Sequence, residues 1–282
     1  MALTVNTNVT SLMVQRNLNR ASDALSTAMS RLSSGLKINS AKDDAAGLQI
    51  ATRMTSQIRG QNMAIKNASD GISIAQTAEG AMQESTNILQ RMRELAVQAR
   101  NDSNGTNDRV ALNKEFSQMS AELTRIAKST NLNGKNLIDG SAGTMTFQVG
   151  SNTGPDNQIS LDLTAKFDAA SLSVDSGTIA ITGDSATIEG NTKNALQKID
   201  AALQTINSSR ADLGAAQNRL TSTISNLQNI NENASAALGR VQDSDFAAET
   251  AQLNKQQTLQ QASTAILAQA NQLPNAVLKL LQ

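Results

Sequence analysis

The chain of 282 residues contains no cysteine and no histidine, and its only aromatic residues are four phenylalanines. Without thiols and imidazoles it lacks the side chains of most nucleophile–base pairs and of nearly every zinc or transition-metal site. We therefore predict no catalytic centre, no metal site and no cofactor. A hydrolase built on carboxylates, or on a Ser–Lys pair, remains an alternative that would require a dry, enclosed pocket.

An excess of charge of either sign is also absent, because 24 lysine and arginine residues balance 24 aspartate and glutamate residues. A nucleic-acid-binding protein normally carries a basic face, so we expect no nucleic-acid partner. Long apolar runs are missing as well, both near the start of the chain and elsewhere. The sequence therefore predicts neither Sec-dependent export nor insertion into a membrane.

A heptad pattern is present between Leu196 and Val241. Eleven of its 14 seam positions are apolar, and the exceptions are Arg210, Gln217 and Asn231. Only a long helix places such a series on one face, and that face is narrow enough to fit only other helices. We predict a mainly α fold, in which both ends of the chain contribute to a long coiled-coil bundle.

Both ends of the chain carry similar apolar stripes with a spacing of seven residues. The stripe residues are Leu18, Leu25 and Leu32 at one end and Leu259, Ile266, Leu273 and Leu280 at the other. One such helix alone is marginally stable in water. We expect the two stripes to pair and to become ordered when several copies assemble. The alternative is that both ends pack onto the bundle of their own chain.

The middle of the chain changes from helical to strand periodicity. A helical pattern extends from a capping-box sequence at residues 40–43 to about Arg100, and a shorter one covers residues 112–126. Alternating apolar residues then predict a β-hairpin over residues 144–164. We expect a second, weaker hairpin that turns at residues 183–184, before helix returns at Asn194. Pro274 is expected to kink the last helix.

These patterns suggest a division into three parts. Residues 1–40 and 245–282 form terminal coiled-coil segments. Residues 41–164 and 194–244 form a helical domain that includes the hairpin. Residues 165–193, rich in Ser, Thr, Gly and Asp, form a short variable surface insertion.

Several sequence stretches resemble bacterial flagellin. They are RLSSGLKINSAKDDAAG at 31–47, DGISIAQ at 70–76, QRMRELAVQ at 90–98, ADLGA at 211–215, DSDFAAE at 243–249 and LAQAN at 267–271. The resemblance covers roughly residues 1–150 and 194–282. It implies a subunit that self-assembles into the secreted, extracellular flagellar filament, the propeller for swimming. In the family the paired ends form an inner tube and the long helices form a surrounding shell.

The resemblance also implies partners. Flagellins leave the cell through the flagellar type III export channel, a chaperone holds the C-terminal segment, and cap and hook-junction proteins flank the filament. Host immune receptors recognise three regions. Leu89, Arg91, Leu95 and Glu115 match positions read by the Toll-like receptor for flagellin. Arg31, Asp43 and Asp44 lie in the segment read by the plant receptor, and Leu278, Leu280 and Leu281 match the leucines sensed by inflammasome receptors.

Two other functions would account for the helices. A hook–filament junction protein of the same superfamily shares the terminal helices but generally carries a different middle region. A chemoreceptor-like signalling coiled coil would explain the heptads, but it would need a membrane segment or a sensor domain. The sequence Asp243-Ser244-Asp245 lacks the glycine of a calcium loop, so we interpret it as an acidic helix start.

Overall fold

The computed structural model describes residues 7–184 and 186–280, with side-chain surroundings up to residue 272. The chain divides into two compact units. The terminal unit combines residues 1–58 with 232–282, and the central unit comprises residues 59–231. Two long helices, α2 (Ala45–Ala99) and α4 (Ile188–Gln242), contribute to both units.

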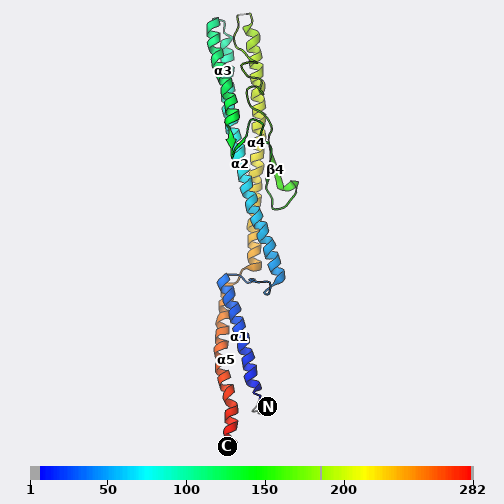
Figure 1. The fold of residues 1–282 in the computed structure, drawn as a ribbon, viewed down its shortest axis with the longest axis vertical. Coiled ribbons are helices and arrows are strands. Elements are labelled where there is room, and N and C mark those ends of the chain that lie inside the picture. Colours follow the sequence, from blue (N-terminus) through cyan, green and yellow to red (C-terminus); the bar gives the residue numbers. More distant parts are fainter. Residues whose placement is uncertain (1–6, 185, 281–282) are drawn as a thin grey trace. The chain divides into compact units, whose positions relative to one another are not determined.

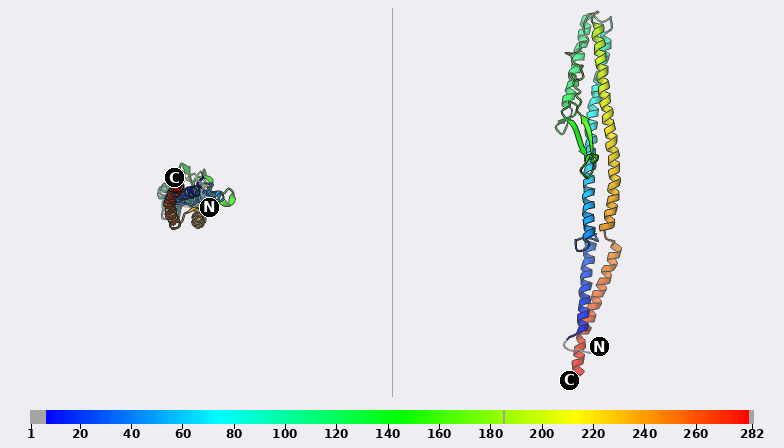
Figure 2. Two further views of the ribbon diagram at one scale, coloured as in Figure 1. Left: turned by 90° about the horizontal axis from the view of Figure 1, so that it is seen from below. Right: turned by 90° about the vertical axis from the view of Figure 1, so that its right-hand side faces the viewer.

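The central unit is a bundle in which α2, α3 (Thr106–Ser129) and α4 run side by side (Figure 1). This confirms the predicted mainly α fold. The hairpin predicted over residues 144–164 is confirmed too, because β3 (Gly143–Gln148) pairs antiparallel with β4 (Gln158–Leu163). Figure 2 shows this hairpin from a second side. Between α3 and β3, the short strands β1 (Asn131–Leu132) and β2 (Lys135–Asn136) form another hairpin. A 3₁₀ turn, η1 (Pro155–Asn157), precedes β4.

The heptad seam of α4 supplies much of the core. Its fully or nearly fully buried members are Ile199, Ile206, Leu213, Leu220 and Leu227, spaced seven residues apart. On α2, the facing residues are mostly small or flexible, namely Ala75, Ala78, Met82, Leu89, Met92 and Leu95. Most of these residues of α2 and α4 belong to one buried cluster, to which neither helix contributes an aromatic residue.

The segment after β4 differs from the prediction. The expected second hairpin is absent from its described residues, which form turns and bends. Residues 165–193 were also expected on the surface, yet Phe167, Val174, Ile179 and Ile181 are almost completely buried in the same core as α2 and α4. Isolated apolar residues in a polar segment show neither helical nor strand periodicity, so no sequence pattern predicts this burial.

The terminal unit is an antiparallel pair of helices, α1 (Val9–Ser34) and α5 (Phe246–Leu280). The start of α1 lies beside the end of α5, where Asn8 Nδ2 donates to the Ala270 carbonyl at 2.8 Å. Near the opposite end, Arg31 Nη1 lies 2.9 Å from Glu249 Oε1. The two chain ends therefore pair with each other within a single molecule, whereas the sequence led us to expect this pairing when several copies assemble.

Two helix starts are shifted from the prediction, those of α2 and α4, and α4 begins at Ile188 instead of Asn194. Asp245 Oδ1 accepts hydrogen bonds from the Ala247 and Ala248 amides, so the acidic start of α5 is confirmed. The sequence placed the start of α2 near Ser40, but α2 begins at Ala45, and Asp44 Oδ1 accepts from the Gly47 amide at 2.9 Å. At the other end, α5 continues as helix through Pro274.

The core position Ile206 and the half-exposed Ile230 lie on the same helix and allow a matched test. Ile206→Ala is expected to lower the free energy of unfolding by about 2–5 kcal/mol, because it leaves a cavity. Ile230→Ala is expected to change it by less than about 1 kcal/mol. Urea unfolding followed by circular dichroism measures both, and equal losses would contradict the assigned helix face.

Candidate assembly and recognition surfaces

The contact between α1 and α5 uses small residues. Ala21 and Ala28 on α1 and Ala270 on α5 are buried, and Gln256 on α5 is nearly so. The predicted stripe residues Leu18, Leu25 and Leu32 are only partly buried beside the alanines. The small side chains therefore form the centre of the contact, and the leucines form its margin.

The stripe on α5 does not face α1. Leu259 is 44% exposed and Ile266 is 53% exposed, so these large apolar side chains remain in contact with water in the single chain. Phe246, at the start of the helix, is also exposed. In the single chain Leu259 and Ile266 do not take the positions that contact α1, because polar Gln256 and small Ala270 occupy them. The expected pairing of the stripes on assembly stays a prediction. Leu273 and Leu280 lie beyond the described side chains.

The connections between helices in the terminal unit bind to each other. Gly35 ends α1 in a left-handed conformation, with φ of 73°, which glycine adopts without steric cost. Its carbonyl accepts from the Ser244 amide at 2.9 Å, and the Lys37 amide donates to the Gln242 carbonyl at 2.7 Å. Backbone hydrogen bonds thus join the segment that connects α1 to α2 with the segment that connects α4 to α5.

The residues expected at a plant receptor take part in this local structure. Arg31 pairs with Glu249, and Asp44 caps α2. Asp43 Oδ2 accepts hydrogen bonds from the amides of Asn39 and Ser40 and from the Ser40 hydroxyl. These bonds, above all those from Ser40, hold the pKa of the Asp43 carboxyl below its usual value. Asp43 is exposed and ionised, in a fixed turn.

The residues expected at the Toll-like receptor divide into two groups. Arg91 is exposed, and its guanidinium bonds Glu115 Oε1 at 2.8 Å and Glu94 Oε2 at 3.0 Å, which raises the pKa of Arg91. Leu89 and Leu95, in contrast, are completely buried in the core. They pack in the core of this chain, because the α2 face that carries them faces α3 and α4. Their expected role at the receptor stays a prediction.

The third set of recognition residues falls outside what the structure describes. Leu278 and Leu280 belong to the last turns of α5, where side chains are not described, and Leu281 lies beyond the described residues. Their expected role stays a prediction.

The three polar interruptions of the α4 seam all lie beside α2 residues of the central unit. Gln217 Nε2 donates to Glu79 Oε2 at 2.9 Å, and Arg210 Nη2 lies 3.8 Å from Glu79 Oε1. Further along, Asn231 Nδ2 donates to Asn62 Oδ1 at 2.7 Å. Polar pairs at seam positions favour one register of two helices over its neighbours.

Arg109 is a structural residue that sequence reasoning missed. Its side chain is 2% exposed, Nε donates to the Ala99 carbonyl at 3.1 Å, and Nη1 donates to the Gly183 carbonyl at 3.3 Å. It therefore joins the end of α2, the start of α3 and the segment before α4. An arginine on an amphipathic helix ordinarily lies in solvent, so the sequence carries no signal for this role.

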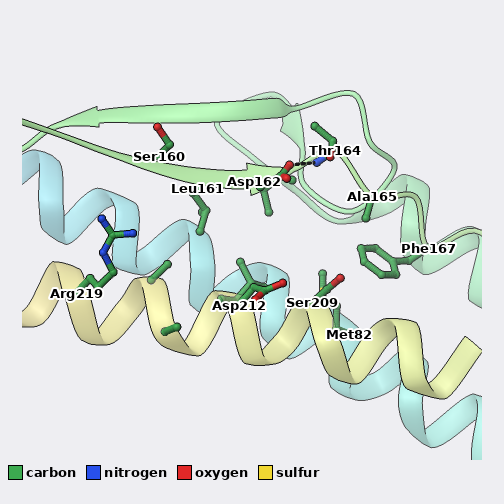
Figure 3. Close-up of a pocket in the computed structure, with 14 residues that line it drawn as sticks. Met82, Ser160, Leu161, Asp162, Thr164, Ala165, Phe167, Ser209, Asp212 and Arg219 are labelled. Carbon is green, nitrogen blue, oxygen red and sulfur yellow. Dashed lines mark hydrogen bonds between the residues drawn. The ribbon is translucent and has the colours of Figure 1, made fainter. Parts of the chain in front are cut away.

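A groove of about 410 Å³ lies between β4 and α4, shown in Figure 3. Leu161, Leu213 and Phe167 line its apolar part, and Asp212 and Arg219 of α4 line its polar part. The lining also contains two serines but no lysine, so the alternative of a Ser–Lys hydrolase has no base in this groove. Asp162 accepts from the Thr164 amide at 3.0 Å.

Comparison with known proteins decides the family. A model of the bacterial flagellin N-terminal helical region matches residues 5–143, and one of the C-terminal helical region matches residues 196–281. The chain belongs to the bacterial flagellin family. It is 41% identical to flagellin A of Vibrio anguillarum and to flagellin A of Vibrio cholerae, in alignments of 379 residues that cover 100% of both chains. Polar flagellin C of Vibrio parahaemolyticus is 39% identical over 385 residues, again with 100% of both chains covered.

Two solved structures align with parts of this chain. The crystal structure of Bacillus cereus flagellin aligns with 57% of this chain and 88% of that chain, with 32% identity and a TM-score of 0.48. A putative flagellar hook-associated protein from Vibrio parahaemolyticus aligns with 71% of this chain and 100% of that chain, with a TM-score of 0.60. Its 12% identity makes this a likeness of fold alone.

Membership in the family establishes the function in outline. The chain is a structural subunit that assembles with identical copies into the extracellular flagellar filament, and it is not an enzyme. The junction-protein and signalling alternatives are not favoured. Within the part of the chain that the structure describes, no helix is long and apolar enough to span a bilayer.

The bond between Glu79 and Gln217 allows a test of the polar seam. Glu79→Ala is expected to lower the free energy of unfolding of the monomer by about 1 kcal/mol, because Gln217 and Arg210 both lose their partner. Glu84→Ala, which removes an exposed carboxylate on the same helix, is expected to cost less than about 0.5 kcal/mol. Chemical unfolding measures the stability of both variants. If the Glu79 variant is as stable as the Glu84 variant, Glu79 does not stabilise the contact between α2 and α4.

Proposed function

We propose that this flagellin makes its subunit–subunit contacts in the filament partly through the exposed stripe of α5. The observation that carries the proposal is the exposure of Leu259 and Ile266 on a helix whose contact with α1 is formed by other residues. Large aliphatic side chains that stay in water in the single chain gain free energy when a second surface covers them. The two chain ends then serve as the terminal coiled-coil segments of the filament.

The stripe also explains how repetition of one contact builds a filament. The apolar face of α5 differs from the face that contacts α1, so a neighbouring copy adds to the α1–α5 pair without replacing it. A contact between two different surfaces, repeated by rotation and rise, produces an open helical polymer. No nucleotide is required, because the driving force is burial of apolar surface.

The double variant Leu259→Gln/Ile266→Gln tests the stripe. It is expected to abolish or strongly reduce filament growth on short filament seeds, because each buried aliphatic side chain contributes about 1.5–3 kcal/mol. Electron microscopy and sedimentation measure the polymer. The helical content of the monomer is expected to stay unchanged, since both side chains are exposed there.

A matched control keeps the stripe apolar. Leu259→Met/Ile266→Met preserves apolar character and approximate volume, so filaments are expected to grow. If the glutamine variant polymerises as well as the methionine variant, the stripe is not an assembly surface.

The export chaperone is proposed to hold the same C-terminal segment before export, so the glutamine variant is expected to co-purify less well with it. Cap and hook-junction proteins are proposed to bind at the two filament ends through these terminal helices.

We further propose that host receptors read the exposed charged surface around Arg91 and Glu115. This rests on the ion pairs that Arg91 makes with Glu115 and Glu94 and on the exposure of the arginine. Arginine is frequent among the residues that dominate binding energy in protein interfaces. Leu89 and Leu95 contribute indirectly, by packing α2 against the core.

Signalling by the monomer in cells that express the Toll-like receptor for flagellin tests this assignment. Arg91→Ala is expected to lower potency roughly tenfold or more, as for an interface arginine that contributes strongly. The conservative core change Leu95→Met is expected to leave potency close to that of the parent. Equal potency of all three proteins would contradict the assignment of the receptor surface.

A further inference from the structure

Two Asn-Gly pairs occur in the described chain, and they differ in their surroundings. Asn133-Gly134 forms the two-residue turn between β1 and β2, with φ of 52° and 76°. Both residues are exposed. Asn104-Gly105 lies just before α3. Asn-Gly is the dipeptide in which a backbone amide nitrogen most readily reaches the preceding side-chain carbonyl, because glycine places no side chain beside that nitrogen.

We propose that Asn133 is a site of spontaneous deamidation in this protein, and that Asn104 is protected. At Asn133 the Gly134 nitrogen, after losing its proton to solvent base, attacks Cγ of the asparagine. The new N–Cγ bond closes a five-membered imide, the Cγ–Nδ2 bond breaks, and the side-chain NH2 group takes up a proton from solvent and leaves as ammonia. Water then opens either carbonyl of the imide, which gives aspartate or isoaspartate at position 133. No other reactant is involved.

The turn leaves both reacting groups accessible. In a two-residue hairpin the flanking residues close the turn by their own hydrogen bonds, so the amide of the second turn residue points to solvent. Around Gly134 there is open space, since a Cβ built there meets no atom within 4 Å. The paired strands are only two residues each, so the turn can open locally to the geometry of attack.

The second pair is held in place at both reacting groups. Asn104 Nδ2 donates to the Gln98 carbonyl at 2.6 Å, which fixes the side-chain amide. The Gly105 amide donates to Asp108 Oδ2 at 2.9 Å as part of the start of α3. Cyclisation at Asn104 must break both bonds and disturb the helix start, so the same dipeptide reacts more slowly there.

Deamidation at Asn133 would change the chain beyond its charge. Isoaspartate inserts one additional carbon into the backbone of a turn whose two residues both have positive φ. Four residues later the chain enters the core, with Leu137 and Ile138 almost completely buried and the Leu137 amide bonded to the Thr130 carbonyl at 3.0 Å. The modified turn would therefore disturb the hydrogen bond and the buried side chains that hold the segment leading into β3.

Timed incubation of the purified full-length protein at mildly alkaline pH tests the proposal. Trypsin releases residues 129–135 and 101–109 as separate peptides, so fragment mass spectra assign a gain of one mass unit to each asparagine. In the folded protein Asn133 is expected to convert at least roughly tenfold faster than Asn104. In urea the two rates are expected to become similar, because the protecting bonds at Asn104 are lost.

Two variants sharpen the experiment. Asn133→Gln is expected to stop conversion in the 129–135 peptide at this position, since glutamine would have to form a less favourable six-membered ring. Asp108→Ala frees the Gly105 amide and is expected to speed conversion of Asn104 roughly fivefold. Equal rates at the two sites in the folded protein would overturn the proposal. So would conversion at both sites in urea with none at Asn133 in the folded chain.

Discussion

The structure depends on the packing of α2 against α4 through a seam of small and branched side chains. Buried isoleucines and leucines recur every seven residues on α4, and alanines and methionines meet them from α2. Because aromatic residues are few, a continuous seam of aliphatic side chains supplies most of the burial that large rings would otherwise provide. Three further parts of the chain pack against this pair: α3, the hairpin of β3 and β4, and the segment that contains Phe167 and Ile181.

Polar residues give the seam its register. A purely apolar heptad seam leaves neighbouring registers close in energy, whereas Glu79 meets Gln217 and Arg210, and Asn62 meets Asn231, in one alignment only. Arg109 acts similarly at the other end of α2, where its buried guanidinium binds carbonyls from two segments of chain. Long slender helices that must repeat identically in every copy of a filament benefit from such fixed alignment.

The terminal unit follows a different rule. Its intramolecular contact is small and partly polar, with Ala21, Ala28, Ala270 and Gln256 at the centre, while larger apolar residues such as Leu259 and Ile266 stay exposed. A contact of this kind holds α1 and α5 together without using up the apolar surface that neighbouring copies would cover. In the proposed filament contact, the single chain and the neighbouring copy use different faces of the same helix.

The sequence by itself determined the helical fold, the β3–β4 hairpin and the family, because heptad spacing, two-residue alternation and long motifs are local properties of the chain. It also placed the acidic start of α5 correctly. Only the tertiary structure decided which side chains face inward. Leu89 and Leu95 share α2 with Arg91 yet are buried, and Leu259 and Ile266 have heptad spacing yet are exposed. The same holds for residues 165–193, whose apolar side chains reach the core without any periodicity. Burial depends on which surface lies opposite, and residues distant in the sequence supply that surface.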